Sequence, residues 1–141
     1  MFSAAASPFG RPQSIANAYR DVGVQTGVSG ASPHQLVSML FDGYMDALSQ
    51  ALGAMQAGQI EAKGRAISRA VRIIEEGLKA SLNLTGGGTL AGDLHDLYAY
   101  TVVRLTQANL RNDAKALEEC RALIEPLRSA WKAIGVDAAA A

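Results

Sequence analysis

The sequence predicts an all-α fold, an antiparallel up-and-down bundle of four helices that follows an N-terminal arm. Four stretches repeat their apolar residues at intervals of three and four, which is the period of one helix face. Each stretch is bounded by residues that start or stop helices, and few β-branched runs occur outside the arm. Short connections cannot return the chain along the length of a helix, so consecutive helices must alternate in direction.

Composition divides the chain into three parts. Residues 1–31 contain Pro8, Pro12 and several glycines with weak periodicity, so we expect a largely extended arm that can form one short helix near Ile15. Residues 32–134 carry the helical periodicity and form the bundle. Residues 135–141 are mostly alanine, and we expect them to form a flexible tail.

The first helix is predicted from Ser32 to about Ala57. The run Ser32-Pro33-His34-Gln35 can form a capping box, in which the serine and glutamine side chains each accept from the other's backbone N–H. Gly58 is the expected left-handed stop.

The second helix is predicted from about Gln59 to Leu84, before the break at residues 85–88. Its polar side carries two pairs with favourable (i, i+4) order, Glu61–Arg65 and Glu75–Lys79. Each such pair stabilises a helix by roughly 0.3–0.5 kcal/mol.

The third helix is predicted from about Thr89 to Arg111 and the fourth from Ala114 to about Ile134. Asn112 can adopt the left-handed conformation that ends one helix, and Asp113 can cap the next. The fourth helix has a heptad seam that includes Cys120, and Pro126 predicts a kink.

The sequence offers no pattern for catalysis, and we expect neither an enzyme nor a bound metal or cofactor. Ala31 and Gly92 stand where a di-iron bundle would need glutamates, three residues before His34 and His95. Nucleophile-elbow and phosphate-loop patterns are also missing. We expect Cys120 to be a buried, inert thiol, and a single cysteine fits a reducing compartment.

Charge and hydropathy exclude two further classes of partner. The formal net charge is zero, so the chain shows no electrostatic footprint for nucleic acid. It has no apolar run of the length that crosses a bilayer and no secretion signal, so we expect no membrane insertion.

The first helix has more apolar residues than a four-helix core needs, because two apolar stripes together cover well over half of its circumference. The first helix has a second stripe of Val37, Phe41, Tyr44 and Leu48, and the third adds three residues outside its inner face, Tyr100, Val102 and Val103. One interpretation is a thick core with the arm laid over it. The other is a groove for a partner's amphipathic segment, and the two are compatible. The arm could cover such a groove with Ile15, Tyr19, Val22 and Val24.

Several separated motifs occur along the chain in a specific order and spacing. They are Ser32-Pro33 with Leu36, Met39-Leu40-Phe41-Asp42-Gly43, Ile73-Ile74 with Leu82-Asn83, Leu97-Tyr98-Ala99-Tyr100, Arg104-Leu105 with Ala108-Asn109, Asn112-Asp113, and Leu127-Arg128 with Ala130-Trp131. Taken together, these motifs resemble the flagellar secretion chaperone family, FliS. The resemblance implies a cytoplasmic helical bundle that binds the disordered C-terminal segment of flagellin, prevents its premature polymerisation and delivers it to the flagellar export apparatus.

The resemblance also implies a movable N-terminal arm whose tyrosine matches Tyr19. Residues 27–30 have the form of an insertion, although Val28 can instead match the family's valine, which would move Tyr19 out of register. Phe41 stands where the family usually has tyrosine, and Pro126 where it has a helix former.

We therefore predict a non-enzymatic export chaperone that is a monomer or a homodimer. The predicted partner contacts are Phe41, Tyr44, Leu48, Tyr98 and Val102. The predicted gating residues of the arm are Ile15, Tyr19, Val22 and Val24. The competing hypothesis is a homodimeric helical adaptor without a flagellin client, which would use the same surplus apolar surface.

Overall fold

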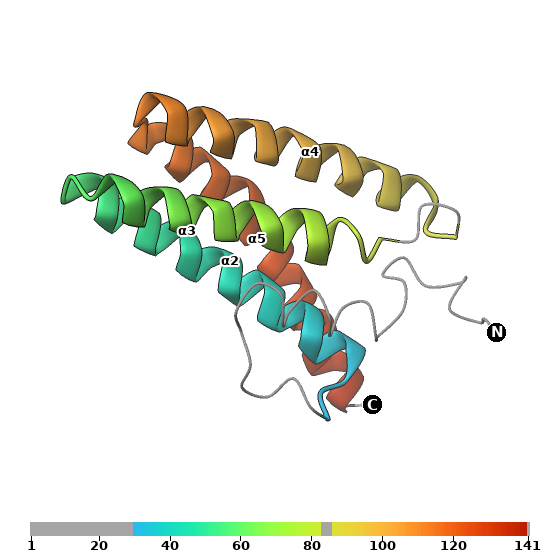
Figure 1. Ribbon diagram of the computed structural model, residues 1–141. Coiled ribbons are helices and arrows are strands. Elements are labelled where there is room, and N and C mark those ends of the chain that lie inside the picture. The colour runs from blue at the N-terminus through green and yellow to red at the C-terminus, as the bar shows by residue number, and fades with distance from the viewer. Residues whose placement is uncertain (1–29, 83–85, 141) are drawn as a thin grey trace.

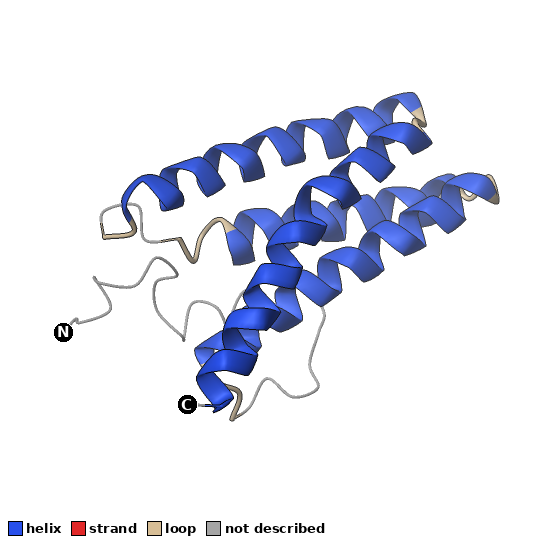
Figure 2. Ribbon diagram, turned by 180° about the vertical axis from the view of Figure 1, so that it is seen from behind, coloured by secondary structure: helices blue, strands red, loops and turns tan. Residues whose placement is uncertain are grey.

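Four helical rods form an antiparallel bundle in the computed structural model, which describes residues 30–82 and 86–140 (Figure 1). The rods are α2 (Pro33–Gln56), α3 (Ile60–Arg72) with the π-helical turn η2 (Ile73–Leu78), α4 (Gly88–Arg111) and α5 (Ala114–Ala140). Each of α2 and α4 lies against both α3 and α5, so α2 and α4 occupy opposite corners. The described part contains helices and no strand (Figure 2), which confirms the predicted all-α bundle. The arm predicted at residues 1–31 lies almost wholly outside the described residues.

Helix α2 begins as its sequence predicts. The Ser32 hydroxyl accepts from the Gln35 amide at 3.1 Å, and the Gln35 side chain accepts from the Ser32 amide at 2.8 Å. This capping box satisfies two amide groups that would otherwise lack intrahelical partners. The helix ends at Gln56, and Gly58 follows with a φ of 72°.

The second rod differs from its prediction, because its last helical residue is Leu78 rather than Leu84. The α-helix ends at Arg72 and widens into η2, where the Lys79 amide bonds to the Ile74 carbonyl five residues earlier at 2.6 Å. A Cβ on Gly77 would lie 2.9 Å from Leu40 Cδ2. The glycine therefore allows η2 to approach α2 closely, a contact between rods that helical periodicity does not encode.

The joint between α4 and α5 confirms its prediction. Asn112 is left-handed, with φ 54° and ψ 49°, and the Asp113 carboxylate accepts from the amides of Lys115 and Ala116. The expected end of α5 near Ile134 is wrong, since the helix continues through Pro126 to Ala140. Proline removes one intrahelical hydrogen bond and its ring crowds the carbonyl four residues earlier. The buried Ile124 and partly buried Leu127 nevertheless hold the flanking turns on the core.

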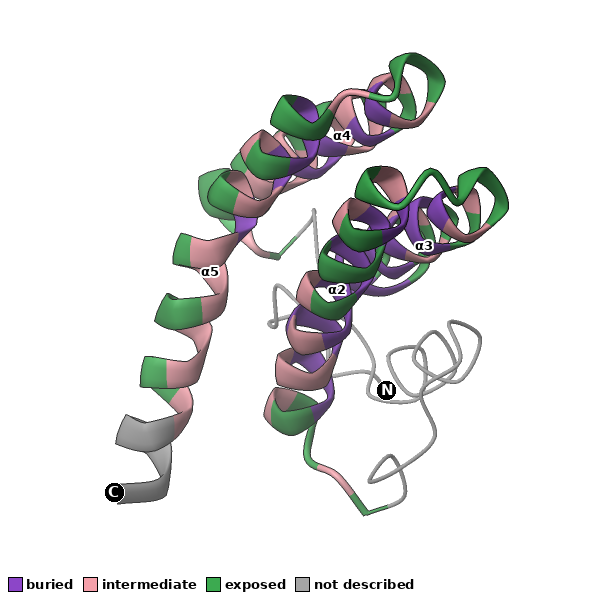
Figure 3. Cartoon of the chain, turned by 90° about the vertical axis from the view of Figure 1, so that its left-hand side faces the viewer, coloured by how far each residue is buried: buried purple, intermediate pink, exposed green. Residues whose placement is uncertain are grey.

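The core runs between the four rods, along the inner faces that Figure 3 shows as buried. Helix α2 contributes most, because it contacts α3 and η2 on one side and α5 on the other. Its wide apolar surface is thus shared by two neighbours. This arrangement determines where the predicted contact residues lie.

One ammonium group links α3 to the C-terminal end of α4. Lys63 of α3 is only 6% exposed, and its Nζ donates to the Asn109 carbonyl and to Asn112 Oδ1, both at 3.0 Å. It thereby satisfies polar groups at the C-terminus of α4, where a positive charge is favourable.

Candidate binding surface

The structure places four of the five predicted partner contacts in the core. Phe41, Tyr44 and Leu48 of α2 are 3%, 0% and 0% exposed, and Tyr98 of α4 is 1% exposed. Val102 of α4 is partly buried and packs against the same core. The second stripe of α2 is therefore interior in this conformation, as the thick-core interpretation expects. Direct contact between a partner and the four buried residues stays a prediction, and it requires that binding uncover them.

Tyr44 has a structural partner that explains its burial. Its hydroxyl donates to the Cys120 carbonyl of α5 at 2.9 Å. Burial raises the pKa of Tyr44 and that of Tyr98 well above the ordinary tyrosine value. Both phenols are therefore neutral groups that help to pack the helices together.

The predicted gating residues Ile15, Tyr19, Val22 and Val24 lie outside the described residues. Their role therefore stays a prediction.

The surplus apolar residues of α4 do reach the surface. Tyr100, Val103 and Leu110 are 46%, 53% and 83% exposed, and we call these three residues the α4 outer face. Val103 and Leu110 are seven residues apart, which places them on the same side of the helix two turns apart. Val102 lies between this face and the core.

Helix α5 anchors one edge of the α4 outer face. The Tyr100 hydroxyl donates to Glu119 Oε2 at 2.6 Å, and Arg104 Nε donates to Glu119 Oε1 at 2.8 Å. The hydrogen bond from Tyr100 has the largest effect on Glu119 and that from Arg104 the next largest, and together they hold the pKa of Glu119 below its usual value. The carboxylate thus stays ionised at neutral pH and holds the aromatic ring across the α4–α5 boundary.

Sequence reasoning found Tyr100 and Val103 but missed Leu110, although a seven-residue step from Val103 would have indicated it. By their spacing Ile60 and Leu90 belong to the inner stripes of the second and third predicted helices, yet they are 74% and 62% exposed. Both residues lie in the first turns of their helices. At a rod's end fewer neighbouring helices remain to cover an inward-facing position.

The family comparison concerns nearly the whole bundle. The model of a family described as "Flagellar protein FliS" matches residues 15–138. The chain belongs to the FliS family. This confirms the resemblance carried by the separated motifs.

Curated FliS proteins extend the match at high identity. A flagellar secretion chaperone FliS of Salmonella typhimurium strain LT2 is 49% identical over 121 residues, which cover 86% of this chain and 90% of that protein. Another, of Escherichia coli strain K12, is 47% identical over 82% of this chain and 85% of the relative. A third, of Bacillus subtilis strain 168, is 31% identical over 77% of this chain and 79% of the relative.

FliS is a family of secretion chaperones and not of enzymes, so the site to explain in this member is a binding surface. The Cys120 thiol is fully buried, and burial raises its pKa to about 12. Among the side chains of residues 30–82 and 86–135, no three histidine, cysteine or acidic groups gather as metal ligands would. No helix in the same ranges has the length and hydropathy to cross a membrane.

Proposed function

We propose that this protein is a cytoplasmic export chaperone that binds the disordered C-terminal segment of flagellin. In this role it prevents premature polymerisation of flagellin and delivers it to the flagellar export apparatus. The observation that carries the proposal is an exposed apolar face on a bundle of the FliS family. Related chains are named flagellar secretion chaperones, and such chaperones need a surface that receives an unfolded client.

The α4 outer face is the proposed docking surface for the client. Burying a valine, leucine or aromatic side chain is worth about 1.5–3 kcal/mol when the side chain is fully covered. Ordering a disordered segment costs roughly 2–5 kcal/mol, so several such contacts are needed to offset it. Tyr100, Val103 and Leu110 contribute the exposed contacts, and Val102 extends them toward the core.

The proposal also gives roles to the four buried predicted contacts and to the N-terminal arm. Phe41, Tyr44, Leu48 and Tyr98 support the docking surface from below and touch the client only if binding opens the bundle. Residues 15–24 of the arm, with Tyr19, act as a movable cover that client binding displaces. Both points extend the sequence prediction and await their own tests.

Calorimetry of the full chain against a synthetic flagellin C-terminal segment tests the proposal. We expect a negative heat-capacity change together with a gain of helix by circular dichroism. Val103→Asp should weaken binding, because it places a charge in a contact that becomes buried. Ile134→Asp on α5 is the matched control, since Ile134 is 56% exposed and Val103 53%. Equal affinities of the folded Val103→Asp variant and the control would remove the α4 outer face from the site.

The competing homodimer hypothesis predicts a different result in sizing chromatography. A chaperone with a free apolar face should form a complex with the flagellin segment. A stable dimer that ignores the segment would instead support an adaptor and overturn the proposed client.

A further inference from the structure

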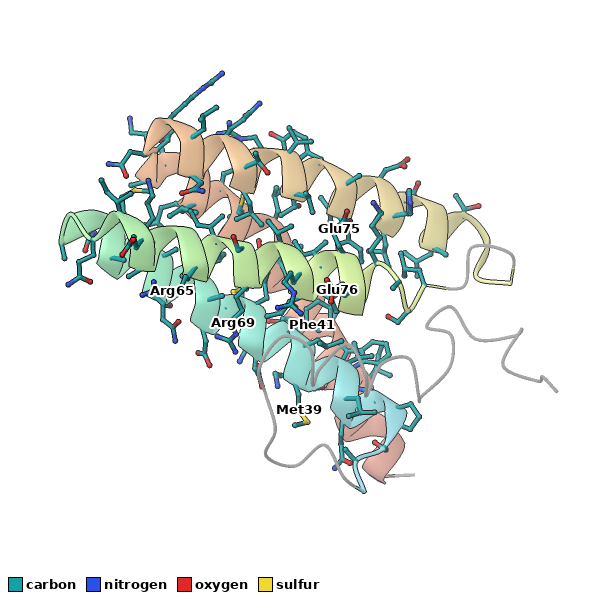
Figure 4. The ribbon with its side chains drawn as sticks, in the orientation of Figure 1. Met39, Phe41, Arg65, Arg69, Glu75 and Glu76 are labelled. Carbon is teal, nitrogen blue, oxygen red and sulfur yellow. The ribbon has the colours of Figure 1, made fainter. Side chains whose placement is uncertain are left out.

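One helix of this neutral chain carries an excess of positive over negative charge. Helix α3 carries Lys63, Arg65, Arg69 and Arg72 against a single acidic residue, Glu61. Lys63 is buried against the end of α4, so the three arginines provide the positive charge on the outer side of α3. We call Arg65, Arg69 and Arg72 the α3 arginine face. Figure 4 shows Arg65 and Arg69 on successive turns, apart from Glu75 and Glu76 at the other end of the rod.

The α3 arginine face borders two hollows. One, of about 630 Å³, lies between α3 and α4 and is lined by all three arginines together with Gly64, Ser68 and Asn109. The other, of about 490 Å³, lies toward α2 and shares Arg65 and Arg69. A Cβ built on Gly64 would meet no atom within 4 Å, so the surface is open there. A chain lying along α3 could therefore reach these guanidinium groups from either side.

Arg65 has its charge available for a partner. The sequence predicted an ion pair with Glu61, and this pair does not form in the described part of the chain. Arg65 is exposed, and its side chain makes no hydrogen bond or ion pair with residues 30–82 or 86–135, whose side chains the structure describes. Arg72, by contrast, contacts Glu76 at 3.4 Å.

We propose that the α3 arginine face binds an acidic segment of a protein partner, at a site separate from the α4 outer face. The arginines recur at intervals of four and three, so they span about 10 Å along the helix axis. Carboxylates repeated at the same intervals on a partner helix would match them, and arginine pairs with carboxylates in a directional, bidentate geometry.

Charge decides between the candidate occupants. Residues 1–29 contain two arginines and one aspartate, so the chain's own N-terminal segment is not complementary to the face. A nucleic acid is disfavoured by the zero net charge and by Glu61, which lines the same hollow as the arginines. An acidic protein segment meets neither objection, since its charges are discrete and can be placed away from Glu61.

The test uses the full-length protein and a labelled alanine-based peptide of about four helical turns. Its glutamates follow the four-and-three spacing, and a second peptide of the same composition distributes them around the helix. Binding is followed by fluorescence anisotropy at low and at physiological ionic strength. Arg65→Glu is the test variant. Arg111→Glu makes the same charge change at another exposed arginine without a partner in the described part, and is the control.

We expect Arg65→Glu to weaken binding of the spaced peptide about fivefold, which is the scale of an exposed ion pair. The Arg111→Glu variant and the wild type should bind alike, and the distributed peptide should bind more weakly to both. Equal losses in the two variants, or no saturable binding, would overturn the proposal. A single-stranded RNA that binds more tightly with the same dependence on Arg65 would assign the face to nucleic acid. A dimer that Arg65→Glu dissociates would assign it to a second copy of the chain. Flagellin-segment binding should be unchanged in Arg65→Glu, so the two proposals fail separately.

Discussion

Gly135→Ala probes the contact that closes one end of the bundle between α2 and α5. The rings of His34 and Trp131 stack with centroids 4.6 Å apart and planes 9° from parallel. His34 Nε2 donates to the Trp131 carbonyl at 2.7 Å, and Trp131 Nε1 donates to the His34 carbonyl at 3.0 Å. A Cβ on Gly135 would lie 2.7 Å from both ring nitrogens of His34. The imidazole would therefore have to leave its position.

The expected free-energy change is a difference between opposing effects. Replacing glycine by alanine inside a helix favours folding by about 1 kcal/mol. Displacing the imidazole loses a stacked pair worth about 0.5–1.5 kcal/mol and a hydrogen bond worth about 1 kcal/mol. Strain from the added methyl group contributes about 1 kcal/mol or more. We therefore expect Gly135→Ala to lower the free energy of unfolding by about 2 kcal/mol.

Gly53→Ala is the matched control, because a Cβ at Gly53 of α2 would meet no atom within 4 Å. This variant should gain up to about 1 kcal/mol, so the two alanine substitutions should have opposite signs in urea denaturation. Trp131 is the only tryptophan, so its emission reports the contact directly and should shift to the red in Gly135→Ala. Removing the imidazole with His34→Ala should make Gly135→Ala stabilising. Equal stabilisation by both glycine substitutions, with unchanged emission, would refute the reasoning.

Four further outcomes are expected. Tyr44→Phe should lower the free energy of unfolding by about 1 kcal/mol in urea, because the Cys120 carbonyl loses its donor; weaker binding of the flagellin segment would instead make Tyr44 a contact. Lys63→Met should lower the free energy of unfolding by about 2 kcal/mol in the same assay, because the Asn109 carbonyl and Asn112 Oδ1 lose the ammonium donor. An unchanged free energy of unfolding would contradict this role. The Cys120 thiol, with its pKa raised to about 12, should react with a disulfide reagent at pH 8 only after denaturant is added, so rapid native labelling would contradict its burial. Deleting residues 1–24 should preserve cooperative unfolding monitored by circular dichroism, because helix capping begins at Ser32; loss of the transition would make the arm a core element.

Features that depend on neighbouring residues could be predicted from the sequence. Ser32 and Gln35 form their capping box within four consecutive residues, and Asn112 ends α4 immediately before Asp113 caps α5. These contacts need no partner from elsewhere in the chain. For this reason the starts of α2 and α5 agree with their predictions.

Features that depend on another helix could not be predicted in this way. The π turn is accommodated where Gly77 lies against Leu40, residues that are far apart in the sequence. Within the second rod, the expected Glu75–Lys79 pair forms at 3.0 Å, whereas the expected Glu61–Arg65 pair does not form among the described side chains.

In the candidate site, too, the sequence predicted which residues are apolar, and packing between helices decided which of them are exposed. Both α2 and α4 carry apolar residues beyond one stripe, and the sequence does not distinguish them. Helix α2 packs more closely against α3 than α4 does, so Phe41 and Tyr44 are buried. On α4 the residues beyond the inner stripe include Val103, which stays exposed.

The sequence by itself determined the helical fold, its caps, the family and the excess of apolar residues. Periodicity and capping are local properties of the chain, and the family is carried by the order of its motifs. Only the tertiary structure decided which apolar residues are core and which are surface. That outcome depends on how closely each helix packs against its neighbours in the bundle, which no single helix can specify.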